Sequence, residues 1–182
     1  MAKVSIVYHS GFGHTKVIAE AVARGARQIA GTEVQVVPVE SVEQHWGALE
    51  ASDAIIFGSP TYMGTVSGPF KSFMDASAKT WFEQKWKDKL AAGFTNSGGL
   101  SGDKLNTLQT LAVFAAQHGM LWVGQAEAVV PGGVNRLSSY LGAMTQAGNV
   151  SPEEEPGSAD QATGEAFGKR VAHAAARWLR GA

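Results

Sequence analysis

Residues 4–15 read Val4-Ser5-Ile6-Val7-Tyr8-His9-Ser10-Gly11-Phe12-Gly13-His14-Thr15, and this stretch decides the fold class. Its first five residues are β-branched or mostly apolar, as expected for a strand that is covered on both faces. After Thr15 the apolar residues recur with a helical period until Gly31, which ends the predicted helix. A strand that enters a helix through a short glycine turn is typical of a parallel α/β sheet.

The same alternation continues along the chain. Further strands are predicted at 34–39, at 54–58 (ended by Ser59-Pro60), at 90–94, and as one interrupted strand at 120–123 and 126–130. Helices are predicted from the capping box at 41–44, from Gly68-Pro69, from Leu105 to His118, and from the capping box at 158–161. We therefore expect one domain over residues 1–182, an α/β fold with a doubly wound, five-stranded parallel sheet and helices on both faces.

Composition limits the possible chemistry. The chain has 182 residues, of which 45% are hydrophobic and 17% are charged, so a disordered chain is excluded. The net charge of −1 gives no global field towards nucleic acid or an anionic membrane. The absence of cysteine excludes disulfides, thiolate nucleophiles and iron–sulfur clusters, so redox chemistry requires a bound cofactor. We expect a cytoplasmic protein, because neither a secretory signal nor a membrane span is evident. We expect no metal site, because no Asp, Glu or His residues have metal-ligand spacing.

Four loops that follow predicted strands are rich in small polar residues. They cover residues 10–15, 60–65, 96–102 and 131–135. Ligands of such sheets bind at the carboxyl ends of the strands, so we expect these loops to converge on one rim.

The first loop has the features of a phosphate site. Its two glycines free backbone amides, the following helix offers its positive end, and Ser10 and Thr15 add hydroxyls. It lacks the Gly-Lys-Ser/Thr of an ATPase loop, and Lys16 replaces the third glycine of the dinucleotide motif. An ordinary strand-to-helix turn is the alternative for this loop taken alone. With the polar loops and Tyr62, the turn suggests a mononucleotide whose flat ring lies across the edge of the sheet.

Three motifs give a more specific indication. The segments 8–15, 58–64 and 118–120 resemble the WrbA family of FMN-dependent NAD(P)H:quinone oxidoreductases, in the flavodoxin-like superfamily. The similarity is clearest up to about Val123 and weakens after Pro131. The resemblance implies a flavodoxin-like fold with noncovalently bound FMN, and a homotetramer with active sites at subunit contacts.

The resemblance also implies roles for individual residues. The phosphate would bind to Ser10, Gly11, Phe12, Gly13, His14 and Thr15. The isoalloxazine ring would be bordered by Pro60, Thr61, Tyr62, Met63 and Gly64 on one side, and by Asn96, Ser97, Gly98, Gly99, Leu100 and Ser101 on the other. His118 would contact the flavin from another subunit or a neighbouring loop, and Trp81 would stack where nicotinamide and quinone alternate. Tyr62 stands where many members carry arginine, and residues 134–137 also depart from the family's usual loop.

Taken without the resemblance, several of these residues have structural interpretations. A lone histidine such as His118 is often a helix cap or a hydrogen-bonded core residue. Trp81 lies among other aromatics and lysines, which suits either a surface cluster or a stacking wall with cations for the NADPH phosphate. The side chain of His14 is assigned no role, and Trp122 and Trp178 are expected in the core.

The resemblance favours a ping-pong reaction. NAD(P)H passes hydride to FMN and leaves, and a quinone then takes two electrons at the same face. Amides near Asn96–Gly99 are candidates to stabilise the charge gained on reduction. The main alternative is a flavodoxin-type single-electron carrier that docks on redox partner proteins, against which the small net charge weighs. A cofactor-free interaction module on the same fold is a third class.

Overall fold

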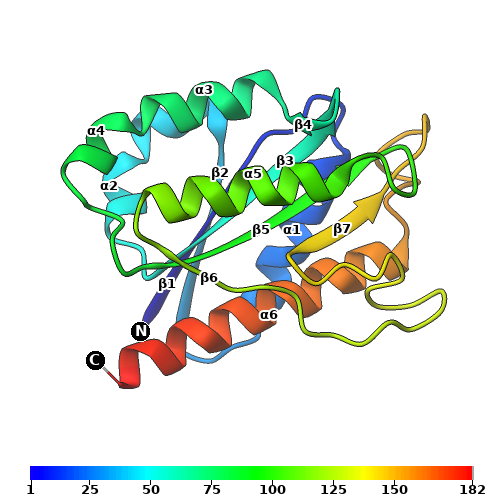
Figure 1. Ribbon diagram of the computed structural model, residues 1–182. Helices are drawn as coiled ribbons and strands as arrows, with labels where there is room; N and C mark the ends of the chain where they lie inside the picture. The colour runs from blue at the N-terminus through cyan, green and yellow to red at the C-terminus, as the bar shows by residue number, and fades with distance from the viewer. Residues whose placement is uncertain (182) are drawn as a thin grey trace.

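The computed structural model describes residues 1–181 and contains a parallel sheet with helices on both faces (Figure 1). The sheet order is β2-β1-β3-β5-β6, in which β4 pairs with β3 and β7 pairs with β5. The strands are β1 (Ala2–Tyr8), β2 (Thr32–Pro38), β3 (Ala54–Tyr62), β4 (Thr65–Val66), β5 (Leu90–Ser97), β6 (Leu121–Trp122) and β7 (Ala143–Gln146). The doubly wound α/β prediction is confirmed, although the sheet has seven strands because the fifth position is divided and β4 is added.

Side chains on the two faces of the sheet form two cores. Helices α1 (His14–Arg27) and α6 (Ser158–Arg180) cover one face, where Ile6 of β1 packs with Phe167. Helices α3 (Gly68–Ala76) and α5 (Lys104–Gln117) cover the other face, where Val7 packs with Phe57. Successive residues of β1 thus serve opposite cores, and this is why the strand is apolar throughout. The smaller helices are the 3-10 helix η1 (Val39–Gln44), α2 (Trp46–Glu50) and α4 (Ala78–Phe82).

Both predicted capping boxes are wrong. Ser41 lies inside η1, where its hydroxyl donates to the carbonyl oxygen of Pro38 at 3.1 Å. Ser158 is the first residue of α6, which is capped by Gly157 without a side-chain bond. The fourth residue of the predicted box, Gln161, donates its side-chain amide to the carbonyl oxygen of Pro156 at 3.0 Å instead.

Strand β3 continues through Ser59-Pro60, where the sequence predicted a break. Pro60 pairs with Asn96 of β5, while on the other side the amide of His9 donates to Gly58 and pairing with β1 ends. The backbone polar groups of Pro60 face this β1 side, two residues beyond Gly58. The missing N–H of the proline therefore costs no ladder bond, and the strand carries Thr61 and Tyr62 to the rim.

The predicted interrupted fifth strand is correct in its first part and wrong in its second. Residues 126–130 form no strand, and β7 at Ala143–Gln146 completes the edge of β5 instead. The intervening segment folds on itself, because Gln125 donates its amide to Tyr140 and the side chain of Asn135 donates to Glu127. Residues 131–135 are thereby held away from the rim.

Two apolar residues lie elsewhere than the helical period predicted. Trp178 is 47% exposed near the end of α6, and Leu105 is 52% exposed on α5. Trp122 does pack against the core, and its indole N–H donates to the carbonyl of Leu141 at 2.7 Å. Apolar residues at the margin of the apolar face of a helix remain in solvent when the sheet does not extend beneath them.

Candidate functional site

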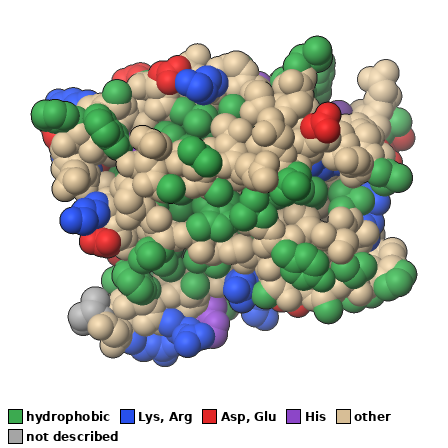
Figure 2. All heavy atoms as spheres, in the orientation of Figure 1, with side chains coloured by type: hydrophobic (Ala, Val, Ile, Leu, Met, Phe, Trp, Pro, Cys, Tyr) green, Lys and Arg blue, Asp and Glu red, His purple; other side chains and the backbone are tan. Residues whose placement is uncertain are grey.

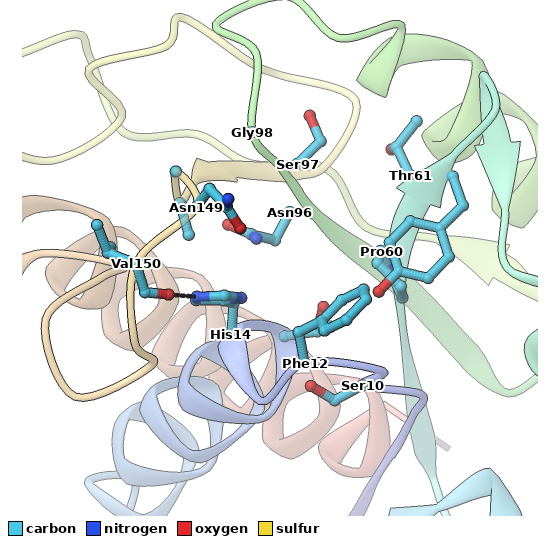
Figure 3. Close-up of a pocket in the computed structure, with 14 residues that line it drawn as sticks. Ser10, Phe12, His14, Pro60, Thr61, Asn96, Ser97, Gly98, Asn149 and Val150 are labelled. Carbon is cyan, nitrogen blue, oxygen red and sulfur yellow. Dashed lines mark hydrogen bonds between the residues drawn. The ribbon is translucent and has the colours of Figure 1, made fainter.

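A pocket of about 440 Å³ opens at the carboxyl ends of β1, β3, β5 and β7 (Figure 3). This volume lies within the range of roughly 300–1,000 Å³ that is usual for small-molecule sites. The lining residues are Ser10, Phe12, His14, Thr15, Pro60, Thr61, Tyr62, Asn96, Ser97, Gly98, Ala147, Gly148, Asn149 and Val150. Neither acidic side chains nor Lys or Arg occur among them, so any bound anion must be held by neutral donors.

The turn between β1 and α1 supplies such donors. Gly13 caps α1 with a φ of 91°, a left-handed conformation that favours glycine. Within residues 1–181, the amides of His14 and Thr15 donate to no protein acceptor, although both lie in the first turn of α1. Unpaired amides at the positive end of a helix are suited to bind an anion, which is the role that the sequence predicts for this turn.

The side chains of the turn are fixed by two further bonds. The hydroxyl of Ser10 accepts the amide of Lys16 at 3.1 Å, so its own proton remains available to the pocket. The ring Nε2 of His14 lies 2.9 Å from the carbonyl oxygen of Val150 and donates to it (Figure 3). This bond joins the turn to the loop at Ala147–Val150, and it gives the His14 side chain a structural role that sequence analysis missed.

The ends of β3 and β5 present a second donor. Thr145 donates its hydroxyl to the side-chain oxygen of Asn96 at 2.9 Å, which leaves the Asn96 NH₂ group without a protein acceptor within residues 1–181. Thr61 is instead used internally, since its hydroxyl bonds Thr95 at 2.8 Å and Thr107 at 2.7 Å. Figure 3 shows the Asn96 side chain directed into the space between the turn and the far loop.

Two aromatic rings form the mouth of the pocket. Phe12, which is 74% exposed, packs edge-on against Tyr62 with ring centroids 6.2 Å apart. Partial burial raises the pKa of the Tyr62 phenol above its ordinary value, so the phenol is neutral at pH 7. A Cβ added to Gly11 would lie only 2.8 Å from the Tyr62 hydroxyl, so a larger residue there would displace the Tyr62 ring. An exposed aromatic mouth offers a surface on which flat rings can stack.

The structure brings together most of the predicted cofactor residues. Gly11 and Gly13 shape the turn with their backbone and are absent from the lining, while Met63 and Gly64 lie beyond the wall in the turn between β3 and β4. The lining of the other wall stops at Gly98. Leu100 and Ser101 line a neighbouring groove, and Gly99 lines neither.

The predicted fourth loop at 131–135 is wrong, and Ala147–Val150 takes its place. Asn135 is buried, its amide donating to Thr163 at 2.8 Å. The signal for the correct loop was the Ala-Gly-Asn sequence at 147–149, which is typical of a turn after a strand.

Trp81 and His118 lie together but apart from this pocket. Both line a separate hollow of about 380 Å³ with Phe82, Gln84, Lys87, Ala116, Gln117 and Gly119. Helix α5 begins near the pocket at Lys104 and ends at Gln117, and a helix of 14 residues is about 21 Å long. The expectation that His118 reaches the flavin from a neighbouring loop of the same chain is therefore wrong.

The surroundings of His118 define its protonation. Ser77 donates its hydroxyl to the carbonyl of Met74 at 2.7 Å, so Nε2 of His118 must donate to Ser77, 2.9 Å away. Nδ1 then carries a lone pair and has no partner among residues 1–181. Burial against Trp86 and Phe114 lowers the pKa of His118 to about 4, because charging the ring there loses solvation.

A family model described as NADPH-dependent FMN reductase matches residues 29–135, which is more than half of the chain. The chain belongs to this family. The predicted cofactor class, FMN, is thereby confirmed.

Individual relatives of this FMN reductase family member have two kinds of name. Flavodoxin FldP of Pseudomonas aeruginosa is 37% identical, over 94% of this chain and 96% of the relative. An NAD(P)H dehydrogenase (quinone) of Archaeoglobus fulgidus is 34% identical, over 96% and 98%. A solved structure, a flavodoxin described as WrbA-like from Agrobacterium tumefaciens, is 42% identical, with a TM-score of 0.78 over 97% and 99%. The resemblance to the WrbA family is thus confirmed.

The surface over α5 and β6 has an apolar region. Figure 2 shows hydrophobic side chains gathered along the middle of the face that carries α5. Exposed residues on α5 and the segments around β6 are Leu105, Val113, Leu121, Val129, Val130 and Tyr140.

No helix within residues 1–181 has both the length and the apolar composition needed to cross a lipid bilayer. The same residues contain no cluster of three or more acidic, His or Cys side chains suited to a metal ion.

Proposed function

We propose that this protein is an FMN-dependent oxidoreductase that transfers two electrons from NAD(P)H to a quinone by a ping-pong mechanism. The observation that supports it is the pocket itself, which combines neutral donors with an open mouth formed by the aromatic rings of Phe12 and Tyr62. An open mouth leaves room for a second flat molecule, as two substrates that use one face in turn require. The quinone dehydrogenase relatives support the same substrates.

The chain's own residues would bind and orient the cofactor. The amides of His14 and Thr15 and the hydroxyl of Ser10 would hold the phosphate, which the positive end of α1 favours. The Asn96 NH₂ group and the backbone of Ser97-Gly98 would meet the polar edge of the ring. When bound, FMN supplies the hydride and electron chemistry, and the protein supplies binding, orientation and electrostatics.

The proposal includes a homotetramer. Trp81 is 49% exposed and lies in a different hollow from the pocket, so it would reach a reacting ring only from another subunit. His118 would belong to the same contributed surface, next to the exposed apolar residues of α5. Apolar patches that exceed scattered single residues are typical of interfaces. Size-exclusion chromatography with light scattering tests the assembly, and a monomer at micromolar concentration would contradict it.

An absorption spectrum tests the activity. Purified protein loaded with FMN is mixed with NADPH or NADH without oxygen, and we expect the flavin band to bleach rapidly and to return when a quinone is added. Trp81→Ala should slow the quinone step while FMN stays bound, whereas Trp178→Ala, at an exposed tryptophan outside both cavities' linings, should change neither. Unchanged turnover of Trp81→Ala would remove Trp81 from the site.

A single-electron carrier is the second candidate. The relative named flavodoxin FldP favours it, because it is 37% identical over nearly the whole chain. A carrier would keep its yellow colour with reduced nicotinamide nucleotides and would bleach only when a partner reductase is added. The same anaerobic experiment therefore distinguishes the two functions.

A further inference from the structure

Lys104 is a buried cation beside the candidate cofactor pocket. It is 0% exposed and is the first residue of α5. Its ammonium donates to the carbonyl oxygens of Gly99 and Leu100, the latter at 3.1 Å. Within residues 1–181 no carboxylate forms an ion pair with it. Burial lowers the pKa of Lys104 to about 8, although the negative charge of Asp160 raises that pKa in part.

This location is energetically unfavourable for a lysine. A buried charge is costly unless it is paired, and the positive end of a helix repels a cation. Two backbone carbonyls offset only part of that cost. A cation kept in such a place, beside a pocket for an anionic ligand, needs an explanation beyond the stability of the free protein.

The same loop is held from a second direction. Gln146 donates its side-chain amide to the carbonyl of Gly98 at 3.1 Å, and its own carbonyl accepts from Arg136 at 3.2 Å. Arg136 in turn makes two bonds of 2.7 Å to Asp160, which is 1% exposed. Asp160 is paired with Arg136, so its attraction compensates the charge of Lys104 only in part.

These bonds determine how the loop presents its amides. Three successive carbonyls, from Gly98 to Leu100, are engaged by Gln146 and Lys104. In a planar trans peptide the N–H points opposite to the C=O, so the three following amides point away from these side chains. Within residues 1–181 the amides of Gly99, Leu100 and Ser101 donate to no protein acceptor. The first of them directly follows Gly98, which lines the pocket.

We propose that Lys104 is a positioning residue that fixes the Gly98–Ser101 loop and places a buried, only partly compensated positive charge behind it, so that the site favours the more negative, reduced state of a bound flavin. This inference rests on the proposed function, because it assumes that FMN occupies the pocket. Preorganised amides and a fixed charge stabilise developing negative charge most strongly where water is excluded.

Three variants test the proposal. Lys104→Met removes the charge and the donors, Lys104→Gln keeps donors without the charge, and Lys89→Met is the matched control. Lys89 is also a partly buried lysine that donates to a backbone carbonyl, that of Ser52 at 2.7 Å, but it lies at the start of β5, at the opposite end of the sheet. Backbone amide order parameters of Gly98–Ser101 are measured by NMR in each apoprotein, and the midpoint potential of bound FMN is measured against reference dyes.

In Lys104→Met we expect the loop order parameters to fall from about 0.85 to below about 0.6. In Lys104→Gln they should stay high. In both variants reduced FMN should bind at least tenfold more weakly relative to oxidised FMN, a shift of about 30 mV to more negative potential for two electrons. Lys89→Met should resemble the wild type in both measurements.

Unchanged potentials in both Lys104 variants would overturn the charge effect, and unchanged order parameters in Lys104→Met would overturn the positioning role. If Lys104→Met does not fold, Lys104→Gln still tests the charge, and its loop must remain ordered. Wild-type protein that takes up no FMN would instead overturn the proposed function, while the apoprotein measurements would still decide whether Lys104 holds the loop.

Discussion

Acid should destabilise this protein through His118. The ring is 5% exposed, packs 4.4 Å from the centroid of Trp86, and has a folded pKa of about 4 against 6.5 for the free side chain. The unfolded chain therefore binds a proton at a higher pH than the folded chain does. The stabilisation is complete above pH 6.5 and is lost as the pH falls towards 4.

The size of the effect follows from the two pKa values. One pKa unit corresponds to 1.36 kcal/mol, so the full difference is worth about 3 kcal/mol. Between pH 7 and pH 5, where only part of the difference is expressed, the loss is about 2 kcal/mol. We expect the free energy of unfolding of the apoprotein, measured in urea, to fall by this amount more in the wild type than in His118→Gln.

A matched control isolates the site. His173→Gln removes an exposed histidine of α6 and should retain the wild-type pH dependence. Equal losses of unfolding free energy in His118→Gln and wild type between pH 7 and pH 5 would contradict a role for His118. An NMR titration midpoint of the His118 ring near 6.5 would contradict it as well.

Three further predictions concern the turn, the loop network and Lys104. Gly13→Ala should lower stability by about 1–2 kcal/mol because of the left-handed backbone, and its Cβ, 2.8 Å from Pro152, should also weaken FMN binding. Fluorescence quenching of FMN measures the binding. Gly31→Ala has similar backbone strain but open space around the Cβ, so it should leave FMN binding intact. Asp160→Asn leaves Arg136 without its carboxylate and should lower the free energy of unfolding in urea by about 2 kcal/mol. Glu165→Gln, in the exposed pair with Arg24, should lower it by less than about 1 kcal/mol. Because the pKa of Lys104 is lowered to about 8, the apoprotein should gain stability between pH 8 and 10.5 relative to Lys104→Met, and a parallel pH dependence of the two proteins would contradict this.

Much of the fold could be predicted from local patterns. The apolar run of β1, the period of α1 and the glycine at position 13 each follow from neighbouring residues, and all are present in the structure. The turn between β1 and α1 was predictable for the same reason, because its unpaired amides belong to consecutive residues. The strand end predicted at Ser59-Pro60 was wrong, because a proline interrupts a β-ladder only where the ladder needs an N–H donor at that position.

The sequence alone establishes the alternation of strands and helices and the glycine turn before α1. It also establishes that any redox chemistry of this chain, which has no cysteine, requires a bound cofactor. Only the tertiary structure decided that β7 completes the sheet, that Ala147–Val150 closes the pocket and that Lys104 lies beneath the rim. It also separated His118 from the pocket by the length of α5. The physical reason is that turns and periodicity depend on adjacent residues, whereas the partners across a pocket depend on strand register and on how a long connection returns to the sheet.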